Sequence, residues 1–365
     1  MSKRVLLAAG GTGGHVFPAR AAADALIARG WSVRLITDAR GAKHTADFPA
    51  ETVDIIEAAS PSTKNPIRLA KAMLSLARGV GQARTIVKDW KPDVVAGFGG
   101  YPAFPALAAA RLAGLPTAIH EQNAVLGRVN RVFAAKAGFV ASGFERLDRA
   151  PKNTKRLITG NPVREPILAA RAAGYPTLTD DGKINILVLG GSLGARILSE
   201  TVPQAIAALP KRLRSRLEVA QQTREESLPM AVSIYQSADI AADCRPFFDD
   251  VGERLASAHL VIARAGASSV SEVACAGRPA IFIPLAIAAD DHQTANAESL
   301  VAAGAADSIP ESDFNVDALA ELLEARLSNI DDLKHRADTA RAVGRPNAAD
   351  MFADAVDALM KRTKS

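Results

Sequence analysis

Four glycine-rich stretches each follow an apolar run and precede a segment with helix-forming composition, and their chemistry is that of anion binding. They lie at residues 10–15, 97–101 and 190–194, and the fourth opens at Gly266. Glycine lets backbone N–H groups approach an anion closely, and the helix that follows directs the positive end of its dipole at the same point. One such loop is frequent in proteins without a ligand there. Four in one chain predict a phosphate-bearing ligand.

A dinucleotide is one ligand that would suit the first stretch. Residues 11–16 nearly match the Gly-x-Gly-x-x-Gly/Ala pattern, and Asp38 is placed to anchor a ribose. However, the third small residue of that pattern is replaced by Val16, which would obstruct close packing of helix and strand. No Gly-Lys-Ser/Thr follows any glycine run, so a Walker loop is absent from the sequence. A different nucleotide is therefore favoured.

Metal and thiol chemistry have little support in the sequence. No Asp-x-Asp element occurs, and the pairs Asp249-Asp250 and Asp290-Asp291 are interpreted as loop caps or sugar contacts. We expect no metal and no cofactor, so that backbone N–H groups, helix dipoles and an arginine would have to neutralise a leaving diphosphate. The two cysteines, Cys244 and Cys275, are interpreted as buried thiols in a reducing compartment.

The elements that must position these loops alternate as strand, helix and strand. The first half predicts strands at 4–8, 32–36, 92–97 and 116–119, with helices at 18–29 and 105–112. The second half repeats this order, with strands at 184–189, 259–263 and 279–283 and a helix at 270–276. The fold class is α/β, with two tandem Rossmann-like parallel-sheet domains and a cleft between them. We predict domains at 1–161 and 162–346, and a terminal helix within 347–365 that packs back on the first domain.

Length, composition and charge fit this organisation. The 365 residues suffice for two α/β domains, and 48% hydrophobic with 23% charged residues is an ordinary globular composition. No apolar run approaches the ~20 residues of a membrane-spanning helix, and the N-terminus is interpreted as a strand rather than a signal peptide. Residues 1–164 contain 24 Lys and Arg against 11 Asp and Glu, a net charge of +13, whereas the remainder has a net charge of −8. Such a basic half attracts phosphorylated substrates, anionic lipid or nucleic acid.

A series of ordered motifs resembles the MurG family of GT-B glycosyltransferases, which transfer N-acetylglucosamine in bacterial cell-wall synthesis. The motifs cover nearly the whole chain and are residues 10–19, 97–101, 120–123 (His-Glu-Gln-Asn), 160–164 (Gly-Asn-Pro-Val-Arg), 190–196 and 268–272. The resemblance implies inverting transfer from UDP-N-acetylglucosamine to the C4 hydroxyl of an undecaprenyl-linked N-acetylmuramoyl-pentapeptide. It also implies a peripheral enzyme at the cytoplasmic face of the cell membrane, with roles in cell shape and division.

The same resemblance implies a role for particular residues. Ser192 and Arg164 would bind the diphosphate, the main chain at Phe248 would meet uracil, and Glu272 would accept hydrogen bonds from the ribose. Gln293, beside His292, would contact the sugar hydroxyls, and His15 and Glu121 would face the acceptor as candidate general bases. The remaining substrate-binding residues would be Thr12, Gly13, Gly14, Asn123, Ala267, Ser268, Ser269, Val270 and Ser271. Two positions depart from the family pattern: His292 stands where some relatives have glutamine, and Phe248 replaces a smaller aliphatic residue.

Simpler interpretations of these residues stay open at this point. His15 could cap a helix that begins near residue 17, and Arg164 could form a structural ion pair. Glu272 could lie in the first turn of a helix, where the helix dipole stabilises an acidic side chain. A UDP-sugar 2-epimerase of related fold is the alternative function. A nucleic-acid-binding protein is disfavoured because aromatic residues are only 5% of the chain and are not interleaved with the basic ones.

The segment at residues 64–91 is the predicted contact with the membrane. It mixes Lys64, Arg68, Lys71, Arg78, Arg84 and Lys88 with apolar residues. On a helix, Leu69, Met73, Leu76 and Val80 form one apolar stripe with basic flanks, which suits either a buried core or an anionic lipid surface.

Overall fold

The computed structural model describes residues 3–61, 65–191, 194–285 and 291–364, and the chain forms two compact units. Unit 1 comprises Met1–Arg164 together with Pro346–Ser365, and unit 2 comprises Glu165–Arg345. The chain therefore passes out of unit 1 after Arg164, three residues beyond the boundary predicted from the sequence, and returns to it for the last helix.

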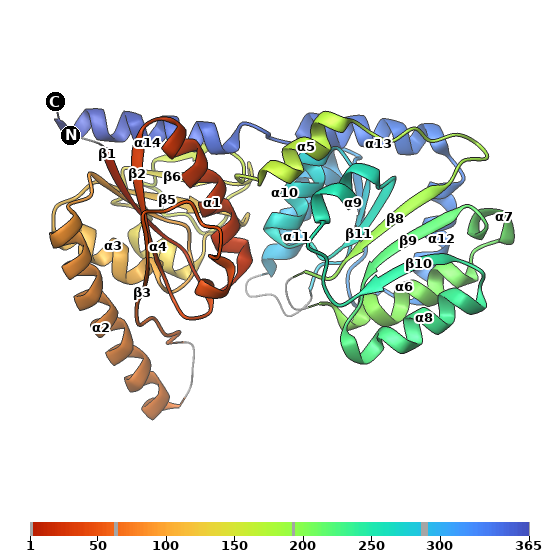
Figure 1. Cartoon of the computed structure of the whole chain (residues 1–365), viewed down its shortest axis with the longest axis horizontal. Coiled ribbons are helices and arrows are strands. Elements are labelled where there is room, and N and C mark those ends of the chain that lie inside the picture. The colour runs from red at the N-terminus through yellow and green to blue at the C-terminus, as the bar shows by residue number, and fades with distance from the viewer. Residues whose placement is uncertain (1–2, 62–64, 192–193, 286–290, 365) are drawn as a thin grey trace. The chain divides into compact units, whose positions relative to one another are not determined.

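Unit 1 is built on a parallel sheet. Its described strands are β1 (Lys3–Ala8), β2 (Trp31–Thr37), β3 (Thr52–Ile55), β4 (Val94–Gly97), β5 (Thr117–Glu121), β6 (Phe139–Ser142) and β7 (Arg156–Ile158). They lie in the order β3-β2-β1-β4-β5-β6-β7, and every pair is parallel. The central strands β4 and β5 are buried throughout and β1 is buried from Val5 to Ala8, because helices cover both faces of this parallel sheet (Figure 1).

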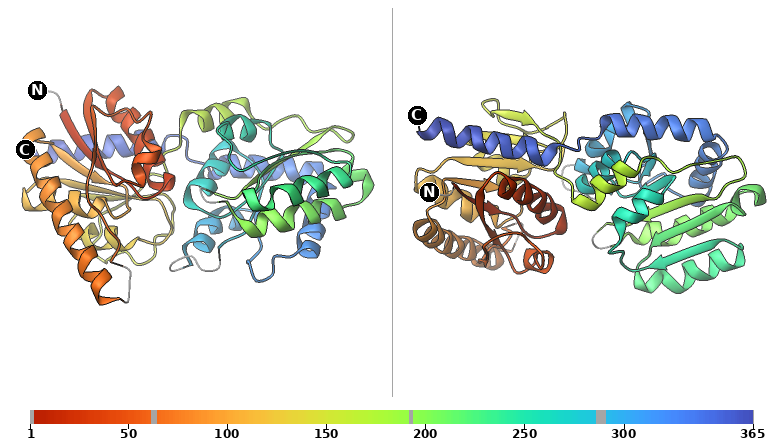
Figure 2. Two further views of the ribbon diagram at one scale, coloured as in Figure 1. Left: turned by 60° about the horizontal axis from the view of Figure 1, so that its bottom comes forward. Right: turned by 45° about the horizontal axis from the view of Figure 1, so that its top comes forward.

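Helices on both faces complete the core of unit 1. They are α1 (Gly13–Ala28), η1 (Gly41–His44), α2 (Pro66–Trp90), α3 (Ala103–Leu112), α4 (Arg128–Ala134) and α14 (Ala348–Lys364). The last of these packs beside α1 (Figure 2), and Phe352 contacts the rings of Phe98 and Phe139. Ion pairs from Lys3 to Asp357 and from Arg29 to Asp354 reinforce this contact.

Unit 2 repeats the architecture. Its described strands are β8 (Ile184–Leu189), β9 (Leu217–Gln222), β10 (Ala241–Arg245), β11 (Leu260–Ala263), β12 (Ala280–Phe282) and β13 (Ala306–Ser308), in the parallel order β10-β9-β8-β11-β12-β13. Its helices are α5 (Glu165–Ala173), α6 (Arg196–Ala208), α7 (Lys211–Arg214), η2 (Glu225–Ser227), α8 (Leu228–Ser237), α9 (Val251–Ser257), α10 (Ala267–Ala276), α11 (His292–Ala302), α12 (Val316–Leu327) and α13 (Ile330–Val343).

The four glycine loops follow the strands at which each sheet reverses its order. In unit 1 the order changes direction between β1 and β4, and in unit 2 between β8 and β11. The loops at residues 10–14 and 97–101 follow the first pair, and those at 190–194 and 264–266 follow the second. In open parallel sheets ligands bind outside the carboxyl ends of the strands at such a reversal. The topology thus places all four loops where a ligand is expected.

One expectation about helices needs correction. Helix α1 begins at Gly13 rather than near residue 18, so Pro18 lies inside it. The first four N–H groups of a helix have no partner within it, so residues 13–16 need none there. Pro18 has no N–H, and the helix therefore lacks only the hydrogen bond from residue 18 to the carbonyl oxygen of Gly14. Separately, no helix in the described ranges has the length and apolar character needed to cross a bilayer.

Candidate functional site

Asp38 holds the first glycine loop in place. Its Oδ1 accepts hydrogen bonds from the backbone N–H groups of Gly11 and Gly41, both at 2.8 Å, and its side chain is buried. The carboxylate that could have anchored a dinucleotide ribose is therefore engaged inside the protein. Its role in this fold is to shape the loop that precedes α1.

His15 lies in the first turn of α1 with one ring nitrogen engaged. Its Nδ1 is 3.1 Å from the carbonyl oxygen of Gly10, and because a carbonyl can only accept, Nδ1 is the protonated nitrogen. This leaves Nε2 with its lone pair. Burial lowers the pKa of His15 below its ordinary value, while the negative charges of Glu121 and Asp38 oppose that shift and Arg40 adds to it. A neutral imidazole with a free Nε2 can accept a proton near pH 7.

The second glycine loop packs directly against the first. Gly100 has a φ of 73°, and a Cβ there would lie 2.5 Å from the carbonyl oxygen of Gly10. Gly99 has a φ of 82°, and a Cβ there would lie 3.2 Å from Nε2 of His15. Both positions require glycine, for the left-handed backbone and for the space. The loop after β4 thus borders the imidazole from one side.

Glu121 ends β5 with its carboxylate fully engaged. Oε1 accepts from the backbone N–H and the side-chain amide of Asn123, at 3.1 and 3.3 Å. Oε2 accepts from the N–H of Gly127 and from Nδ2 of Asn130, both at 2.8 Å. Its side chain is buried, and its charge acts on His15 at the same edge of the sheet. These four donors make Glu121 an organiser of the turn after β5.

His120, the neighbour of Glu121, is a neutral core residue. Its Nε2 lies 3.1 Å from the carbonyl oxygen of Gly160, its Nδ1 lies 3.1 Å from Nε2 of Gln122, and its ring stacks on Phe98 at 5.3 Å. Burial lowers the pKa of His120 to about 4. The motif His-Glu-Gln-Asn thus contributes mainly internal hydrogen bonds.

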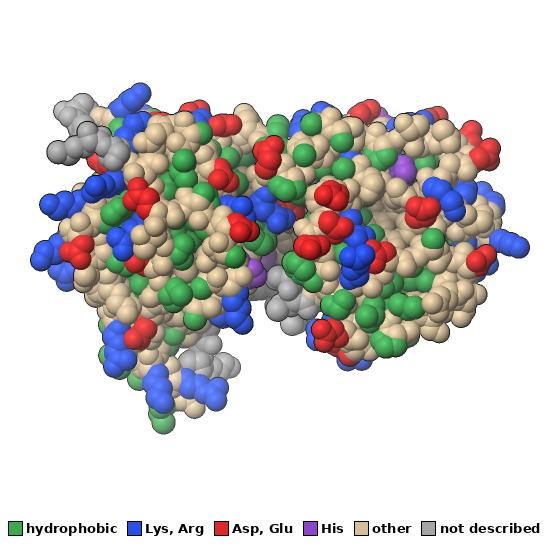
Figure 3. Space-filling view, in the orientation of Figure 1, with side chains coloured by type: hydrophobic (Ala, Val, Ile, Leu, Met, Phe, Trp, Pro, Cys, Tyr) green, Lys and Arg blue, Asp and Glu red, His purple; other side chains and the backbone are tan. Residues whose placement is uncertain are grey.

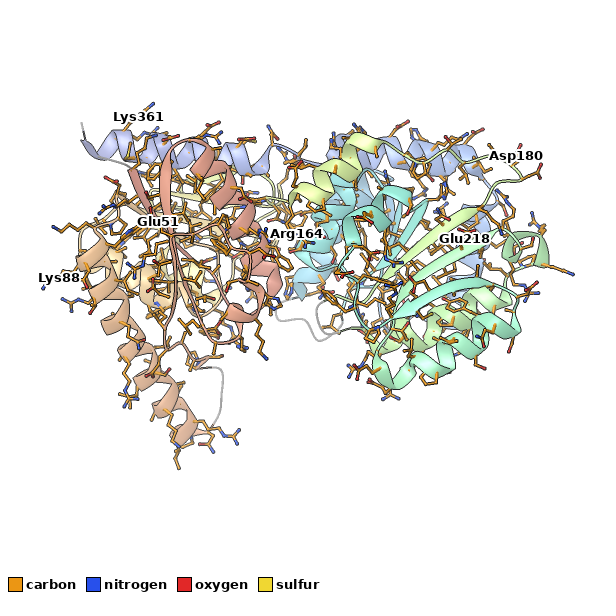
Figure 4. The ribbon with its side chains drawn as sticks, viewed as in Figure 1. Glu51, Lys88, Arg164, Asp180, Glu218 and Lys361 are labelled. Atoms are coloured by element: carbon orange, nitrogen blue, oxygen red, sulfur yellow. The ribbon has the colours of Figure 1, made fainter. Side chains whose placement is uncertain are left out.

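Arg164 and the start of α1 complete the part of the site in unit 1. The guanidinium of Arg164, labelled in Figure 4, lies 4.4 Å from the centre of the Phe17 ring, one helical turn from Gly13 and Gly14. Thr12 occupies the N-cap position of α1 and is exposed, and its side chain makes no capping hydrogen bond. The first N–H groups of α1 therefore have no side-chain cap.

The start of α6 follows the third glycine loop in unit 2. Gly191 and Gly194 have φ of 80° and 68°, and Ala195 at the N-cap gives no side-chain hydrogen bond. Ser192, predicted to bind the diphosphate, lies outside the described residues. Sequence reasoning missed Gln222 at the end of β9, whose amide bonds Gly190 and Gly191. Two consecutive buried glutamines at a strand end were the available signal.

The start of α10 follows the fourth loop and also has no side-chain cap. Gly266 is its N-cap, and buried Asn296 holds the preceding turn through the carbonyl of Ala265 at 3.1 Å. Ser268 Oγ is buried and has no hydrogen-bond partner among the described residues. By contrast, Asn side chains cap α2, α12 and α13. Such an uncapped helix start can bind an anion.

The remaining predicted residues of α10 differ in what they expose. Ala267 and Val270 are buried, so only their backbone is available to a ligand, whereas Ser269, Ser271 and Glu272 are half-buried. Glu272 is the sixth residue of the helix, and the first turn contains no acidic residue. The interpretation of Glu272 as a first-turn dipole partner is therefore wrong.

Phe248 and Gln293 are both engaged within unit 2. The ring of Phe248 is buried under the guanidinium of Arg254, 3.9 Å from the ring centre, so its main chain is what remains for a ligand. Gln293 Oε1 accepts from the N–H of Leu285 at 3.0 Å, and His292 beside it is half-buried at the start of α11.

The aspartate pairs and the cysteines have structural surroundings. Asp250 pairs with Arg254 at 2.7 Å, and Asp291 accepts from Thr294 at 2.8 Å, while Asp290 lies outside the described residues. No cluster of three or more His, Cys, Asp or Glu suited to a metal was found in the part of the chain that is described. Burial raises the pKa of Cys275 to about 11 and also raises that of Cys244, so both are thiols at neutral pH.

Comparison with known proteins agrees with this arrangement. The model of the glycosyltransferase family 28 N-terminal domain matches residues 5–142, and that of the C-terminal domain matches residues 185–354. A UDP-N-acetylglucosamine–N-acetylmuramyl-(pentapeptide) pyrophosphoryl-undecaprenol N-acetylglucosamine transferase of Maricaulis maris is 70% identical over 98% of both chains. The enzyme of the same name from Caulobacter vibrioides is 48% identical over 98% of this chain and 99% of its own.

Solved structures give the same family and a wider set of shared folds. The crystal structure of Acinetobacter baumannii MurG has a TM-score of 0.77 at 35% identity and covers 96% of this chain and 98% of its own. A putative UDP-N-acetylglucosamine 2-epimerase from Listeria monocytogenes has a TM-score of 0.68 at 13% identity, covering 99% and 98%. At that identity the likeness concerns the fold alone.

Proposed function

The chain belongs to the family of UDP-N-acetylglucosamine–N-acetylmuramyl-(pentapeptide) pyrophosphoryl-undecaprenol N-acetylglucosamine transferases, and from this premise we propose how its own residues perform the transfer. The reaction moves N-acetylglucosamine from UDP-N-acetylglucosamine to a hydroxyl of a lipid-linked N-acetylmuramyl-peptide. It needs a base for that hydroxyl and stabilisation of the departing UDP.

Unit 2 binds the donor in this proposal. The starts of α6 and α10 direct uncapped N–H groups to the carboxyl edge of the sheet, where β8 and β11 are neighbours. We assign the diphosphate to these N–H groups, with Ser192, Ser268 and Ser269 as further contacts and Arg164 of unit 1 as the cation. The main chain at Phe248 would contact uracil, Glu272 the ribose hydroxyls, and His292 and Gln293 the sugar.

Unit 1 supplies the base. The observation that supports His15 most is the hydrogen bond of its Nδ1 to Gly10, which leaves Nε2 unprotonated beside the Gly99 loop. Glu121 is a weaker candidate because each of its carboxylate oxygens already accepts two hydrogen bonds. Nε2 would take the proton of the acceptor hydroxyl as that oxygen attacks the anomeric carbon. The UDP oxygen leaves from the opposite side, so the configuration inverts. Thr12, Gly13, Gly14 and Asn123 would line this part of the site.

The mechanism is proposed to be metal-independent. Its basis is the absence of an Asp-x-Asp element from the sequence together with the helix N-termini that can neutralise the leaving diphosphate. Turnover should then persist in excess EDTA. Loss of activity in EDTA that magnesium restores would contradict this part of the proposal.

The experiment that tests the function uses purified chain, UDP-N-acetylglucosamine and a lipid-linked N-acetylmuramyl-peptide. We expect UDP release together with a disaccharide on the lipid. Conversion of the donor to its 2-epimer without transfer would instead establish the alternative activity. A chain that leaves both substrates unchanged would contradict the proposal.

We further propose that α2 is the contact with the cytoplasmic membrane surface. Ile67, Leu69, Met73 and Leu74 near its start are 68%, 39%, 55% and 54% exposed. Figure 3 shows basic side chains around this projecting end, and Arg68 and Lys71 are both exposed. The predicted stripe was partly wrong, because Leu76 is buried and Val80 is half-buried. The large apolar side chains that α2 exposes to lipid therefore lie at residues 67–74, and Lys64 lies outside the described residues.

A further inference from the structure

Gln222, the last residue of β9, connects the two loops on either side of its strand. Its Oε1 accepts a hydrogen bond from the N–H of Gly190 at 3.1 Å, and its Nε2 donates to the carbonyl oxygens of Gly191 and Pro246, both at 3.2 Å. The side chain is 7% exposed. All the hydrogen-bonding groups of one amide are thus used on backbone atoms of two separate loops.

The sheet order explains why this residue can reach both loops. Strand β9 lies between β8 and β10, so its carboxyl end stands between the loop that begins at Gly190 and the segment that begins at Pro246. The first leads into α6, and the second leads to Phe248. A side chain on either neighbouring strand could adjoin only one of them.

The glycine loop that begins at Gly190 needs a fixed partner. A Cβ on Gly190 would lie 2.6 Å from the N–H nitrogen of Ala195, and Gly191 has a φ of 80°. A tight glycine loop has many alternative conformations in the absence of restraints, because glycine has few steric limits. Two hydrogen bonds with the buried Gln222 amide, at Gly190 and Gly191, restrict those alternatives before any ligand arrives.

We propose that Gln222 is a positioning residue that fixes the diphosphate-binding loop and the uracil-binding segment in register with each other. This inference rests on the proposed function, which assigns those two roles to the loops. Gln222 need not touch the donor. It lowers the ordering cost of binding, because both loops are already placed when the nucleotide enters. The expected effect of losing Gln222 is that the diphosphate adds less to the affinity for the nucleotide, because the two loops are no longer placed together before binding.

Gln221 provides a matched control one residue earlier. It points to the opposite face of the sheet, where Oε1 accepts from the Tyr235 hydroxyl at 2.5 Å and Nε2 donates to the carbonyl of Leu198 at 3.4 Å. It is fully buried, and its side chain makes no hydrogen bond to the described residues of either loop. Methionine at either position keeps the length and approximate volume of glutamine while removing its hydrogen bonds.

The experiment compares the wild-type chain with Gln222→Met and Gln221→Met by calorimetry with uridine and with UDP, below the melting temperature of each. For Gln222→Met we expect a roughly tenfold weaker affinity for UDP and a much smaller change for uridine, so the gain from adding the diphosphate shrinks. The KM for the sugar nucleotide should rise while kcat changes little. Gln221→Met should melt earlier but bind UDP as the wild type does.

Three results would overturn the inference. These are unchanged UDP affinity in Gln222→Met, equal loss in both variants, or an equal loss of uridine and UDP affinity in Gln222→Met. If Gln222→Met does not fold, Gln222→Glu replaces it, since it retains the acceptor for Gly190 but opposes two carbonyls with a carboxylate; normal UDP binding there would equally overturn the inference. A wild-type chain that binds neither uridine nor UDP would instead contradict the proposed function itself.

Discussion

His15 and Glu121 interact electrostatically but differ in how many of their polar atoms are already hydrogen-bonded. His15 uses one nitrogen on Gly10 and keeps the other, whereas Glu121 uses both oxygens on the turn formed by Asn123, Gly127 and Asn130. Their separate roles follow from hydrogen bonding rather than from residue type. Glu121 therefore stabilises the loop, and its charge favours the protonated form of His15.

Glu121→Gln tests this division. A glutamine can still accept from Asn123, but its amide group would face the N–H of Gly127 and the amide of Asn130, so two donors lose their acceptor. We expect the free energy of unfolding to fall by roughly 2–4 kcal/mol, with a smaller loss of turnover than in His15→Ala. Denaturant unfolding measures the first, with exposed Glu51→Gln as the control. Unchanged stability with abolished turnover would make Glu121 the base.

His120 gives the fold a dependence on pH. Its pKa is about 4 in the folded chain against 6.5 ordinarily, so unfolding takes up a proton between these values. The contribution of neutral His120 to the free energy of unfolding is complete above pH 6.5. It falls by on the order of 3 kcal/mol as the pH is lowered toward 4. His120→Asn should be less stable at pH 7 but should lose less stability between pH 6.5 and 4. Parallel pH dependences in denaturant unfolding would contradict this assignment.

The position of an individual residue was predictable where the neighbouring sequence determines its local structure. The glycine loops and His15 follow from residue types next to a strand and a helix start. The resemblance named Glu121 as a second candidate base, but the donors that engage its carboxylate come from the turn at 123–130, and no local pattern reveals that geometry. Gln222 was missed for the same reason, since both loops that it bonds are brought to it by strand order.

One arginine donates hydrogen bonds to the C-terminal ends of three helices in unit 2. Arg278 is fully buried and donates to carbonyl oxygens at the ends of α5, α9 and α10, among them Gly174, Leu255 and Ala276. These are the carbonyls that lack partners within their own helices, and the negative dipole ends favour the cation. Burial lowers the pKa of Arg278 to about 10, which still leaves it charged at neutral pH. The opposite end of α10 is the proposed diphosphate site.

Arg278→Met should therefore destabilise unit 2. Several buried carbonyls would lose their donor, and we expect the free energy of unfolding to fall by roughly 2–5 kcal/mol, measured by thermal or denaturant unfolding. Arg212→Met is the control, because that exposed side chain pairs only at the surface with Glu324 and should change stability by less than about 1 kcal/mol. Equal effects of the two substitutions would refute the shared capping role.

Element boundaries show what periodicity can and cannot predict. The strands after which the glycine loops begin were placed within a residue or two, because buried parallel strands are short apolar runs between glycines. The start of α1 was predicted near residue 18, but the helix begins at Gly13 and Gly14, which have low intrinsic helix propensity. The stripe on α2 was periodic, but periodicity does not show how far along a helix the core extends.

Two copies of one topology with opposite net charge make up the chain. The repeated order of strand, glycine loop and helix was visible in the sequence, and both sheets reverse direction at the strands that precede those loops. The return of α14 to unit 1 depends on contacts of Phe352 with residues about 200 or more positions away, which no local sequence pattern reveals. The basic charge of residues 1–164 includes the exposed cations of α2, such as Lys88 in Figure 4.

The charge distribution leads to a prediction about lipid surfaces. The whole chain should bind anionic liposomes reversibly, with each Lys or Arg near the surface contributing about 1 kcal/mol at low salt. Lys71→Glu with Arg78→Glu should weaken flotation, and so should added salt. Lys211→Glu with Arg212→Glu makes the same charge change in unit 2 and should have little effect. Flotation that depends on neither lipid charge nor the α2 variants would exclude α2 as the membrane contact.

If unit 1 supplies the base and unit 2 binds the donor, His15→Ala and Glu272→Ala should change different steady-state constants when they are measured side by side. His15→Ala should lower kcat by ~10²–10⁴-fold with little change in the KM for UDP-N-acetylglucosamine. Glu272→Ala should raise that KM by ~10–100-fold, as expected for a lost charge-assisted hydrogen bond of ~1.5–3 kcal/mol. Near-normal kcat in the first variant, or an unchanged donor KM in the second, would contradict the account.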